Sequence, residues 1–239
     1  MPLKTLVIVP AYNEEVRIAD VLRGIRQHIP HADILIVDDG STDRTRQVAL
    51  GAGAGVTSHP FNLGYGAALQ TGYQYALMKG YEGLVQMDGD GQHDPSSIVA
   101  LLAVIQKGEA DIAIGSRFLE TKEIASAIPP YRAPLMRRLG MRLFGMISSL
   151  LIHQKVTDPT SGFQAMNRRV LEWVSGDRFP CDYPDADVII MLHRAGFRIR
   201  EVPVSMFENR DKKSMHGGWT PLYYVFKMFL SIFVTLMRE

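Results

Sequence analysis

The first half of the chain alternates short apolar runs with stretches in which apolar residues recur every three or four positions. The runs are typical of parallel strands buried on both faces, and the stretches between them are typical of amphipathic helices. We predict strands at residues 6–10, 34–37, 56–58, 83–87 and 110–117. The helices between them are predicted to end near Gln27, Leu50, Met78 and Ile105. This alternation predicts an α/β fold with a mostly parallel sheet flanked by helices.

The pattern changes after about residue 119, where longer helices and loops replace the regular alternation. We predict helices at residues 131–153, 186–194 and 219–239, a strand at 198–204, and loops at 158–163 and 206–218. The last helix is nearly all apolar apart from a narrow polar stripe. The predicted organisation is therefore one domain at residues 1–218 followed by an amphipathic helix at residues 219–239.

Two carboxylates one residue apart follow the strand predicted at residues 83–87. Residues two apart on a strand face the same way, so Asp88 and Asp90 are expected to converge as the strand enters a glycine-rich turn. Carboxylate oxygens suit Mg²⁺ or Mn²⁺, and Mg²⁺ sites combine one or two carboxylates with substrate phosphates. The segment predicts a metal–diphosphate site, although Asp and Gly also form ordinary turns. His93, in the same segment, is open to two roles, metal ligand or turn hydrogen bond.

Acidic residues also follow two other predicted strands. Glu14 follows the first strand, and Asp38 and Asp39 follow the second. Parallel strands joined by right-handed crossovers end at one edge of a sheet, where open α/β sheets bind ligands. Carboxylates gathered there repel one another and require a cation or hydrogen-bond donors. This favours the metal site, and an acid after the second strand is also well placed to bind a nucleoside.

The composition excludes several classes of protein. The chain has 26 basic and 25 acidic residues, so no global field favours nucleic acid. The single cysteine, Cys181, excludes an intrachain disulfide and fits a reducing cytoplasm. We expect neither a signal peptide nor a transmembrane helix. Gly64-Tyr65-Gly66 begins a partial dinucleotide fingerprint, but it lacks the third glycine and follows the third strand, which disfavours an NAD-dependent oxidoreductase.

Further segments complete a pattern that extends over about residues 3–217. In chain order they are PAYNEE at 10–15, VDDGSTD at 37–43, NLG at 62–64, DGDGQHDP at 88–95, GSRF at 115–118 and DPTSGF at 158–163. Together they resemble family 2 glycosyltransferases of the GT-A fold, most closely the branch of dolichyl- or polyprenyl-phosphate mannosyl and glucosyl synthases. The resemblance implies an enzyme that transfers a hexose with inversion from a GDP- or UDP-sugar, with Mg²⁺ or Mn²⁺ held by the D-x-D acids.

The resemblance also implies roles for individual residues. The nucleotide-sugar would be held by Pro10, Tyr12, Glu14, Val37, Asp39, Asp88, Gln92 and Lys213. The metal would be held by Asp88, Asp90 and Gln92. We expect catalysis to involve Asp90, Arg117, Asp158 and Arg210. Arg117 would face the sugar or the acceptor, and the basic loop of Arg210 and Lys213 would close over the diphosphate, although such a loop can also be an ordinary solvated surface.

The nature of the acceptor decides whether a general base is needed. A phosphate monoester has a second pKa of about 6 and arrives as an anion, so no base is required. A hydroxyl acceptor requires a carboxylate base, for which the candidates are Asp158, Asp185 and Asp187. The resemblance favours a polyprenyl or dolichyl phosphate. A glycan hydroxyl acceptor remains an alternative, as does a non-catalytic module that only binds nucleotide-sugar.

Two amphipathic segments indicate contact with a membrane surface or a partner. In the helix predicted at residues 131–153, arginines stand among apolar residues, a pattern of interfacial binding. We assign three of them to the acceptor or lipid side: Arg132, Arg137 and Arg138. The final helix is too apolar for an ordinary surface helix. We expect peripheral contact with the cytoplasmic face of a membrane, or a homo-oligomer; the alternative is that this helix docks on its own core.

Overall fold

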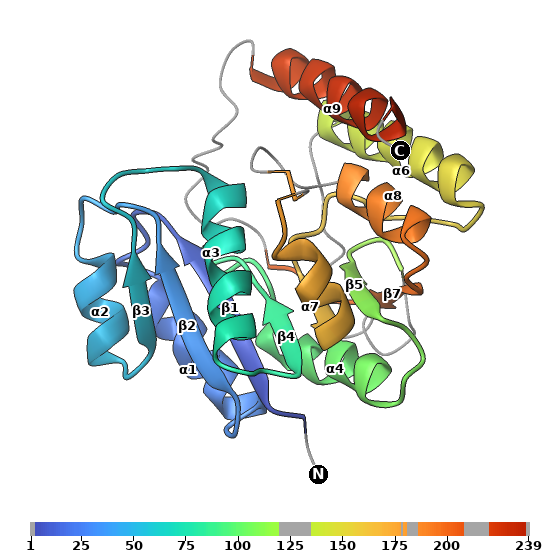
Figure 1. The fold of residues 1–239 in the computed structure, drawn as a ribbon. Helices are drawn as coiled ribbons and strands as arrows, with labels where there is room; N and C mark the ends of the chain where they lie inside the picture. The colour runs from blue at the N-terminus through green and yellow to red at the C-terminus, as the bar shows by residue number, and fades with distance from the viewer. Residues whose placement is uncertain (1–2, 120–134, 178, 181–185, 208–219, 238–239) are drawn as a thin grey trace.

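A seven-stranded sheet with the order β3-β2-β1-β4-β6-β5-β7 forms the centre of the molecule (Figure 1). The computed structural model describes residues 3–119, 135–177, 179–180, 186–207 and 220–237. For residues 135–139 and 220–226 it describes the backbone only. The strands are β1 Thr5–Ala11, β2 Asp33–Asp38, β3 Gly55–Ser58, β4 Gly83–Gln86, β5 Ile112–Ser116, β6 Gln164–Asn167 and β7 Ile199–Pro203. All neighbouring pairs are parallel except those of β6, which is antiparallel to β4 and β5.

Helices cover both faces of the sheet (Figure 1). They are α1 Ile18–His28, α2 Thr45–Gly51, α3 Tyr65–Met78, the short 3-10 helix η1 Pro95–Ser97, α4 Ile98–Gln106, α6 Leu135–Ile152, α7 Arg168–Val174, α8 Ala186–Arg194 and α9 Thr220–Met237. Residues of α1, α2 and α4 share one apolar core, and residues of α3, α6, α7, α8 and α9 share the other. The molecule therefore has three layers, helices–sheet–helices.

Strand β1 lies between the two cores. Leu6 and Ile8 join the core on the α3 side, while Val7 and Val9 join the core on the α1 side. Successive side chains of a strand point to opposite faces, so a strand covered by helices on both sides needs a continuous apolar run. The prediction from the apolar runs, an α/β fold with a mostly parallel sheet, is confirmed.

The loop predicted at residues 158–163 is confirmed, and it leads directly into β6. Strand β6 and helix α7 were not predicted. The sequence of β6, Gln-Ala-Met-Asn, has a polar residue at each end and no clear alternation. Its pairing with β4 and β5, rather than its own pattern, makes it a strand.

The antiparallel direction of β6 brings a distant loop to the carboxyl edge of the sheet. Near that edge Gln86 of β4 pairs with Ile8 of β1. Gln164, the first residue of β6, pairs with Gln86 and with Ile114 of β5. Because β6 is antiparallel to β4 and β5 and starts near the residues where they end, the loop at residues 158–163 lies beside the segments that follow β4 and β5.

Helix α9 packs against α8 (Figure 1), and the Phe229 ring of α9 lies 5.4 Å from the Phe144 ring of α6, measured between centroids. Met228 and Ile232 are buried in the core on that side. The Arg194 guanidinium of α8 donates a hydrogen bond to the Thr235 carbonyl at 2.9 Å. Docking of this helix on its own core is thus observed, and the boundary predicted at residue 218 remains a prediction. In the part of the chain that is described, no helix has the length and apolar character needed to cross a membrane.

Candidate active site

Asp88 follows β4 and is contacted at both of its carboxylate oxygens. Its Oδ1 accepts a hydrogen bond from the Tyr65 hydroxyl at 2.8 Å. Its Oδ2 lies 3.5 Å from Nε2 of His93, and the Asp88 side chain remains 31% exposed. Nδ1 of His93 is buried without a hydrogen-bond partner in the described structure, and the two roles considered for His93 remain predictions. Asp88 is therefore held by the protein and still open to a ligand.

Asp90 follows two residues later and is influenced by the charge of Asp88. Burial raises the pKa of Asp90 above its ordinary value, and the negative charge of Asp88 raises it further. The backbone N–H of Gln92 donates to Oδ1 of Asp90 at 2.9 Å and opposes this rise. A cation bound between the two carboxylates would remove the repulsion that raises the pKa of Asp90.

This donor set fits a divalent metal that also binds phosphate. Among the described residues, no group of three or more His, Cys, Asp or Glu side chains could hold a metal, which excludes a closed cage of structural zinc type there. Mg²⁺ sites usually combine one or two carboxylates with substrate phosphates and water. Asp88 and Asp90 would supply these carboxylates, and Gln92 would add an amide oxygen from the same turn. Their assignment as metal ligands remains a prediction.

The segment after β1 brings Tyr12 and Glu14 to the same edge. Tyr12 is 46% exposed. Glu14 forms an ion pair with Arg17 at 2.8 Å. Burial raises the pKa of Glu14, the Arg17 pair opposes this, and the charge of Asp90 adds to the rise. Because Asp90 affects Glu14 electrostatically, the ends of β1 and β4 bring their acids close together, as the sequence predicts.

Asp39, after β2, is buried and bound to the loop that leads into α3. Its Oδ1 accepts from the Leu63 N–H at 2.9 Å and pairs with Nδ1 of His59 at 2.7 Å. Its Oδ2 accepts from the Gly64 N–H at 2.9 Å. These bonds leave the carboxylate little capacity for a nucleoside, whose binding by Asp39 remains a prediction.

Two other residues assigned to the nucleotide-sugar, Pro10 and Val37, lie within strands. Both are buried, and the Val37 side chain belongs to the core on the α3 side. Only backbone atoms of Val37 could therefore contact a ligand.

Arg117, after β5, is bound to the loop that precedes β6. Its Nε and Nη2 donate to the two carboxylate oxygens of Asp158 at 2.5 Å each. Nη2 also donates to Oγ1 of Thr160 at 3.0 Å. The Arg117 and Asp158 side chains are 6% and 0% exposed. Both carboxylate oxygens of Asp158 are thus bound by one guanidinium in a buried ion pair, which argues against Asp158 as a general base.

Glu201 of β7 binds the start of the same loop. Its carboxylate accepts from the backbone N–H and hydroxyl of Thr157 and from the backbone N–H of Asp158, each at 2.8 Å. Burial raises the pKa of Glu201, and these hydrogen bonds oppose the rise. Glu201 was not among the predicted site residues. The feature that could have indicated it is an acid in an otherwise largely apolar strand.

The remaining predicted residues lie elsewhere or outside the described parts. Asp187 is fully buried and accepts a hydrogen bond from the Ser231 hydroxyl of α9, which argues against it as a general base. Arg137 and Arg138 lie in α6, but their side chains are among those not described. The predicted residues outside the described residues are Arg132, Asp185, Arg210 and Lys213.

Two residues that were not predicted complete the surroundings of Asp88. They are Tyr65, at the start of α3, and Gly162, in the loop before β6. A Cβ atom added at Gly162 would lie 2.7 Å from the Tyr65 hydroxyl and 3.0 Å from each carboxylate oxygen of Asp88. Gly162 belongs to the segment DPTSGF at 158–163 and Tyr65 directly follows the segment NLG at 62–64, but neither residue type alone indicates this contact.

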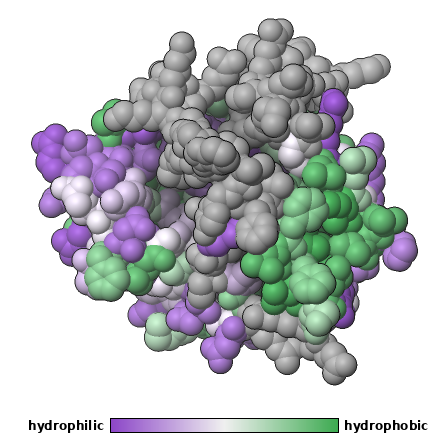
Figure 2. Space-filling view, turned by 90° about the horizontal axis from the view of Figure 1, so that it is seen from above, coloured by the Kyte–Doolittle hydropathy of each residue, from purple (hydrophilic) through white to green (hydrophobic). Residues whose placement is uncertain are grey.

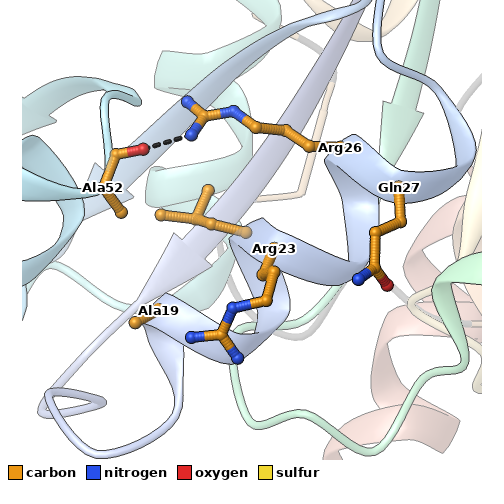
Figure 3. Close-up of a pocket in the computed structure, with 6 residues that line it drawn as sticks. Ala19, Arg23, Arg26, Gln27 and Ala52 are labelled. Atoms are coloured by element: carbon orange, nitrogen blue, oxygen red, sulfur yellow. Dashed lines mark hydrogen bonds between the residues drawn. The ribbon is translucent and has the colours of Figure 1, made fainter.

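A separate pocket of about 370 Å³ lies along α1 (Figure 3). It is lined by Ala19, Leu22, Arg23, Arg26, Gln27 and Ala52. The Arg26 guanidinium donates a hydrogen bond across it to the Ala52 carbonyl. None of the predicted site residues lines this pocket, so we assign the chemistry to the acidic edge of the sheet.

Comparison with known proteins yields consistent matches along most of the chain. Residues 6–174 match the family model described as Glycosyl transferase family 2. The chain is 31% identical to the polyprenol monophosphomannose synthase of Mycolicibacterium smegmatis, over 90% of this chain and 82% of that protein. It is 28% identical to the UDP-N-acetylglucosamine–dolichyl-phosphate N-acetylglucosaminyltransferase of Methanococcus voltae, over 97% of this chain and 96% of that protein.

The similarity to solved structures concerns the fold. The glucosyl-3-phosphoglycerate synthase of Mycobacterium tuberculosis, in complex with Mn²⁺ and uridine-diphosphate-glucose, matches with a TM-score of 0.67 at 20% identity. The match covers 98% of this chain and 78% of that one. It supports the assignment of the three-layer architecture to the GT-A fold.

Proposed function

The chain belongs to glycosyl transferase family 2, and we propose that it transfers a hexose with inversion from a GDP-mannose or UDP-glucose type of donor to a polyprenyl or dolichyl phosphate. The observation that carries this proposal is the pair Asp88 and Asp90 at the carboxyl edge of the sheet, close enough for one charge to raise the pKa of the other group. The proposal is also supported by two relatives whose names state transfer to, or a product on, a polyprenol or dolichyl phosphate.

The chemistry at this edge concerns the leaving group. When the bond to the anomeric carbon breaks, negative charge develops on the phosphate oxygens of the nucleoside diphosphate. A divalent ion, Mg²⁺ or Mn²⁺, neutralises such charge as a Lewis acid when it is bound. Asp88, Asp90 and Gln92 would hold it, while Tyr12 and Glu14 lie on the side proposed for the nucleoside. Tyr65 and His93 keep the Asp88 carboxylate in place.

The described acids favour an acceptor that needs no general base. Asp158 is paired with Arg117, and Asp187 is bonded to Ser231 of a neighbouring helix. A phosphate monoester with a second pKa of about 6 is already an anion at neutral pH and can attack without proton removal. A glycan hydroxyl would require a free carboxylate near the sugar. We therefore propose the lipid phosphate as the acceptor.

A lipid acceptor requires the enzyme to reach a membrane surface, and we propose that α6 and α9 provide that contact at the cytoplasmic face. Figure 2, which views this end of the molecule, shows apolar surface gathered on one side. The exposed apolar side chains there are Met146, Leu150, Phe229, Leu230, Phe233, Val234, Leu236 and Met237. Exposed Arg142 lies on the same face of α6 as Met146 and Leu150, and a cation beside an apolar ridge suits anionic lipid.

The acceptor is tested with matched lipids. The purified chain is incubated with Mn²⁺, radiolabelled GDP-mannose or UDP-glucose, and either polyprenyl phosphate or the polyprenol of the same length. We expect label in the organic phase with the phosphate and not with the alcohol. Equal transfer to the alcohol, or transfer only to soluble saccharides, would establish the hydroxyl acceptor. Donor binding without any transfer would establish a non-catalytic module.

The membrane contact is tested by flotation with anionic vesicles. We expect Phe233→Ser, which changes a side chain 60% exposed on α9, to reduce flotation. Val99→Ser, which changes a side chain 51% exposed on α4 in the opposite helical layer, is the control and should float as the unchanged chain does. If Phe233→Ser instead dissociates a dimer in solution without changing flotation, the surface is a homo-oligomer contact.

A further inference from the structure

We propose that Tyr65 is a positioning residue that fixes the Asp88 carboxylate before metal and donor bind. The hydroxyl of Tyr65 donates to Oδ1 of Asp88 at 2.8 Å. A carboxylate can only accept hydrogen bonds, so the direction of this bond is set by Asp88. An ordinary phenol has a pKa of about 10, so the Tyr65 hydroxyl keeps its proton at neutral pH and can donate this bond.

The Tyr65 hydroxyl is itself held by a chain of buried groups. Nε2 of Gln86 donates to the Tyr65 oxygen at 3.2 Å. The hydroxyl of Tyr73 donates to Oε1 of the same amide. Gln86 and Tyr73 are each 2% exposed. The chain Tyr73–Gln86–Tyr65–Asp88 therefore runs in one direction, from the core on the α3 side to the edge of the sheet, with one donor and one acceptor at each link.

The other sides of the Asp88 carboxylate are enclosed as well. The backbone at Gly162 approaches so closely that an added Cβ would lie 3.0 Å from both carboxylate oxygens. His93 lies 3.5 Å from Oδ2 and is stacked on Phe163, with ring centroids 4.9 Å apart. Tyr65, Gly162 and His93 come from three separate segments and enclose one carboxylate, leaving its solvent-facing side open.

This enclosure determines what Tyr65 contributes. A carboxylate held in one rotamer loses little freedom when a metal and a diphosphate bind, and groups that orient metal ligands contribute in this way to affinity. The inference rests on the proposed function, because it treats Asp88 as a ligand for the metal or the donor. It predicts that the Tyr65 hydroxyl affects metal and donor binding and has little effect on the fold.

The test compares single-hydroxyl deletions on one helix. In Tyr65→Phe we expect the Kd for Mn²⁺ and the KM for donor to rise about tenfold, the lower limit for the loss of such a supporting group. The expected change in kcat is smaller than the change in KM, and the melting temperature should fall by only a few degrees, because the buried Gln86 amide loses one acceptor. Tyr75→Phe removes a hydroxyl from the same helix, where the ring lies under the Lys79 ammonium, and should change neither constant.

A second variant tests the same site by a different change. Gly162→Ala keeps both hydrogen-bonding groups but places a methyl group against them, so it should also raise the Kd for Mn²⁺. Titration with Mn²⁺ alone, followed by UDP and GDP, keeps this test separate from transfer. If the chain binds metal and nucleotide but transfers nothing to lipid phosphate, the proposed function fails and the role of Tyr65 stands. Unchanged Mn²⁺ and nucleotide affinity in Tyr65→Phe would overturn the inference, as would a chain that binds no Mn²⁺.

Discussion

Two groups of carboxylates lie at the same edge of the sheet, and their surroundings differ. Asp90, after β4, is close to a second acid, and the charge of Asp88 raises its pKa. Asp158, beside β5, is fully buried and bound on both oxygens by one guanidinium. The first group has excess negative charge, and the second has its charge balanced by the protein. The first is therefore suited to bind a cation from solution, and the second to hold the loop that carries Gly162.

The most pronounced effect on activity is expected at Asp88 and Asp90, the group with excess negative charge. Asp90→Asn removes one of the two charges proposed to hold the metal and should reduce kcat/KM by about a thousandfold, or about 4 kcal/mol. Its melting temperature should be unchanged or slightly higher, because the repulsion by Asp88 is relieved. The measurement pairs a transfer assay with thermal melting. Asp20→Asn, at an acid 73% exposed on α1, is the control, and more than a tenth of normal activity in Asp90→Asn would contradict the assignment.

The ion pair of Arg117 and Asp158 should show the opposite result, a loss of stability. Asp158→Asn leaves the buried Arg117 guanidinium without its counter-charge, which should lower the free energy of unfolding by about 3 kcal/mol. Denaturant unfolding measures this loss. The double variant Arg117→Met with Asp158→Leu removes both charges and should recover most of it. If Asp158→Asn is as stable as the unchanged chain and only transfer is lost, Asp158 acts in catalysis after all.

Much of the acidic edge could be predicted from the sequence because local patterns determine it. The apolar run before Asp88 and the glycines after it place the acids at a strand end, and the alternation of strands and helices brings several strand ends to one edge. The contacts of these acids could not be predicted in the same way. Arg117 and Asp158 are 41 positions apart in the chain, and Tyr65 and Asp88 are 23 positions apart.

The partners of these acids depend on how strands pair rather than on any local pattern. Strand β6 is short, and its antiparallel insertion between β4 and β5 brings Gly162 against Asp88. The sequence alone shows Asp158 as an acid in a loop, without its partner Arg117, and this is why it was a candidate base. Glu201 was overlooked for the same reason, since its partners lie in a loop 43 or 44 positions earlier.

Asp111, an acid whose charge is balanced by Arg198 away from the proposed metal site, gives the next test, in which pH is the variable. Asp111 is 2% exposed and accepts from the Arg198 N–H and the Asn167 amide at 2.9 Å each. Burial alone would raise the pKa of Asp111, but the hydrogen bonds from Arg198 and Asn167 lower it below its ordinary value. A lowered pKa in the folded state gives stability that is complete above the unfolded value, about 3.9, and is lost as the pH falls toward the folded value.

Asp111→Asn should therefore lower the free energy of unfolding by about 2 kcal/mol at pH 7 and by less at pH 3. Urea unfolding at the two pH values measures the difference, with the exposed Asp20→Asn as control. An equal loss at both pH values would show that Asp111 contributes through packing and not through its charge.

The smallest effect is expected at Gly89, which lies between Asp88 and Asp90. This last test compares Gly89 with Gly162. A Cβ added at Gly89 would lie 3.1 Å from the Pro10 carbonyl, a contact that a small backbone shift relieves, whereas at Gly162 it would lie 2.7 Å from the Tyr65 hydroxyl. Gly89 is not among the glycines with positive φ, so alanine can adopt its backbone conformation. Gly89→Ala should change kcat/KM by less than about threefold, or about 0.7 kcal/mol, while Gly162→Ala costs much more. Equal losses in the two variants, measured in the transfer assay, would show that the turn between the acids is as tightly enclosed as Asp88 itself.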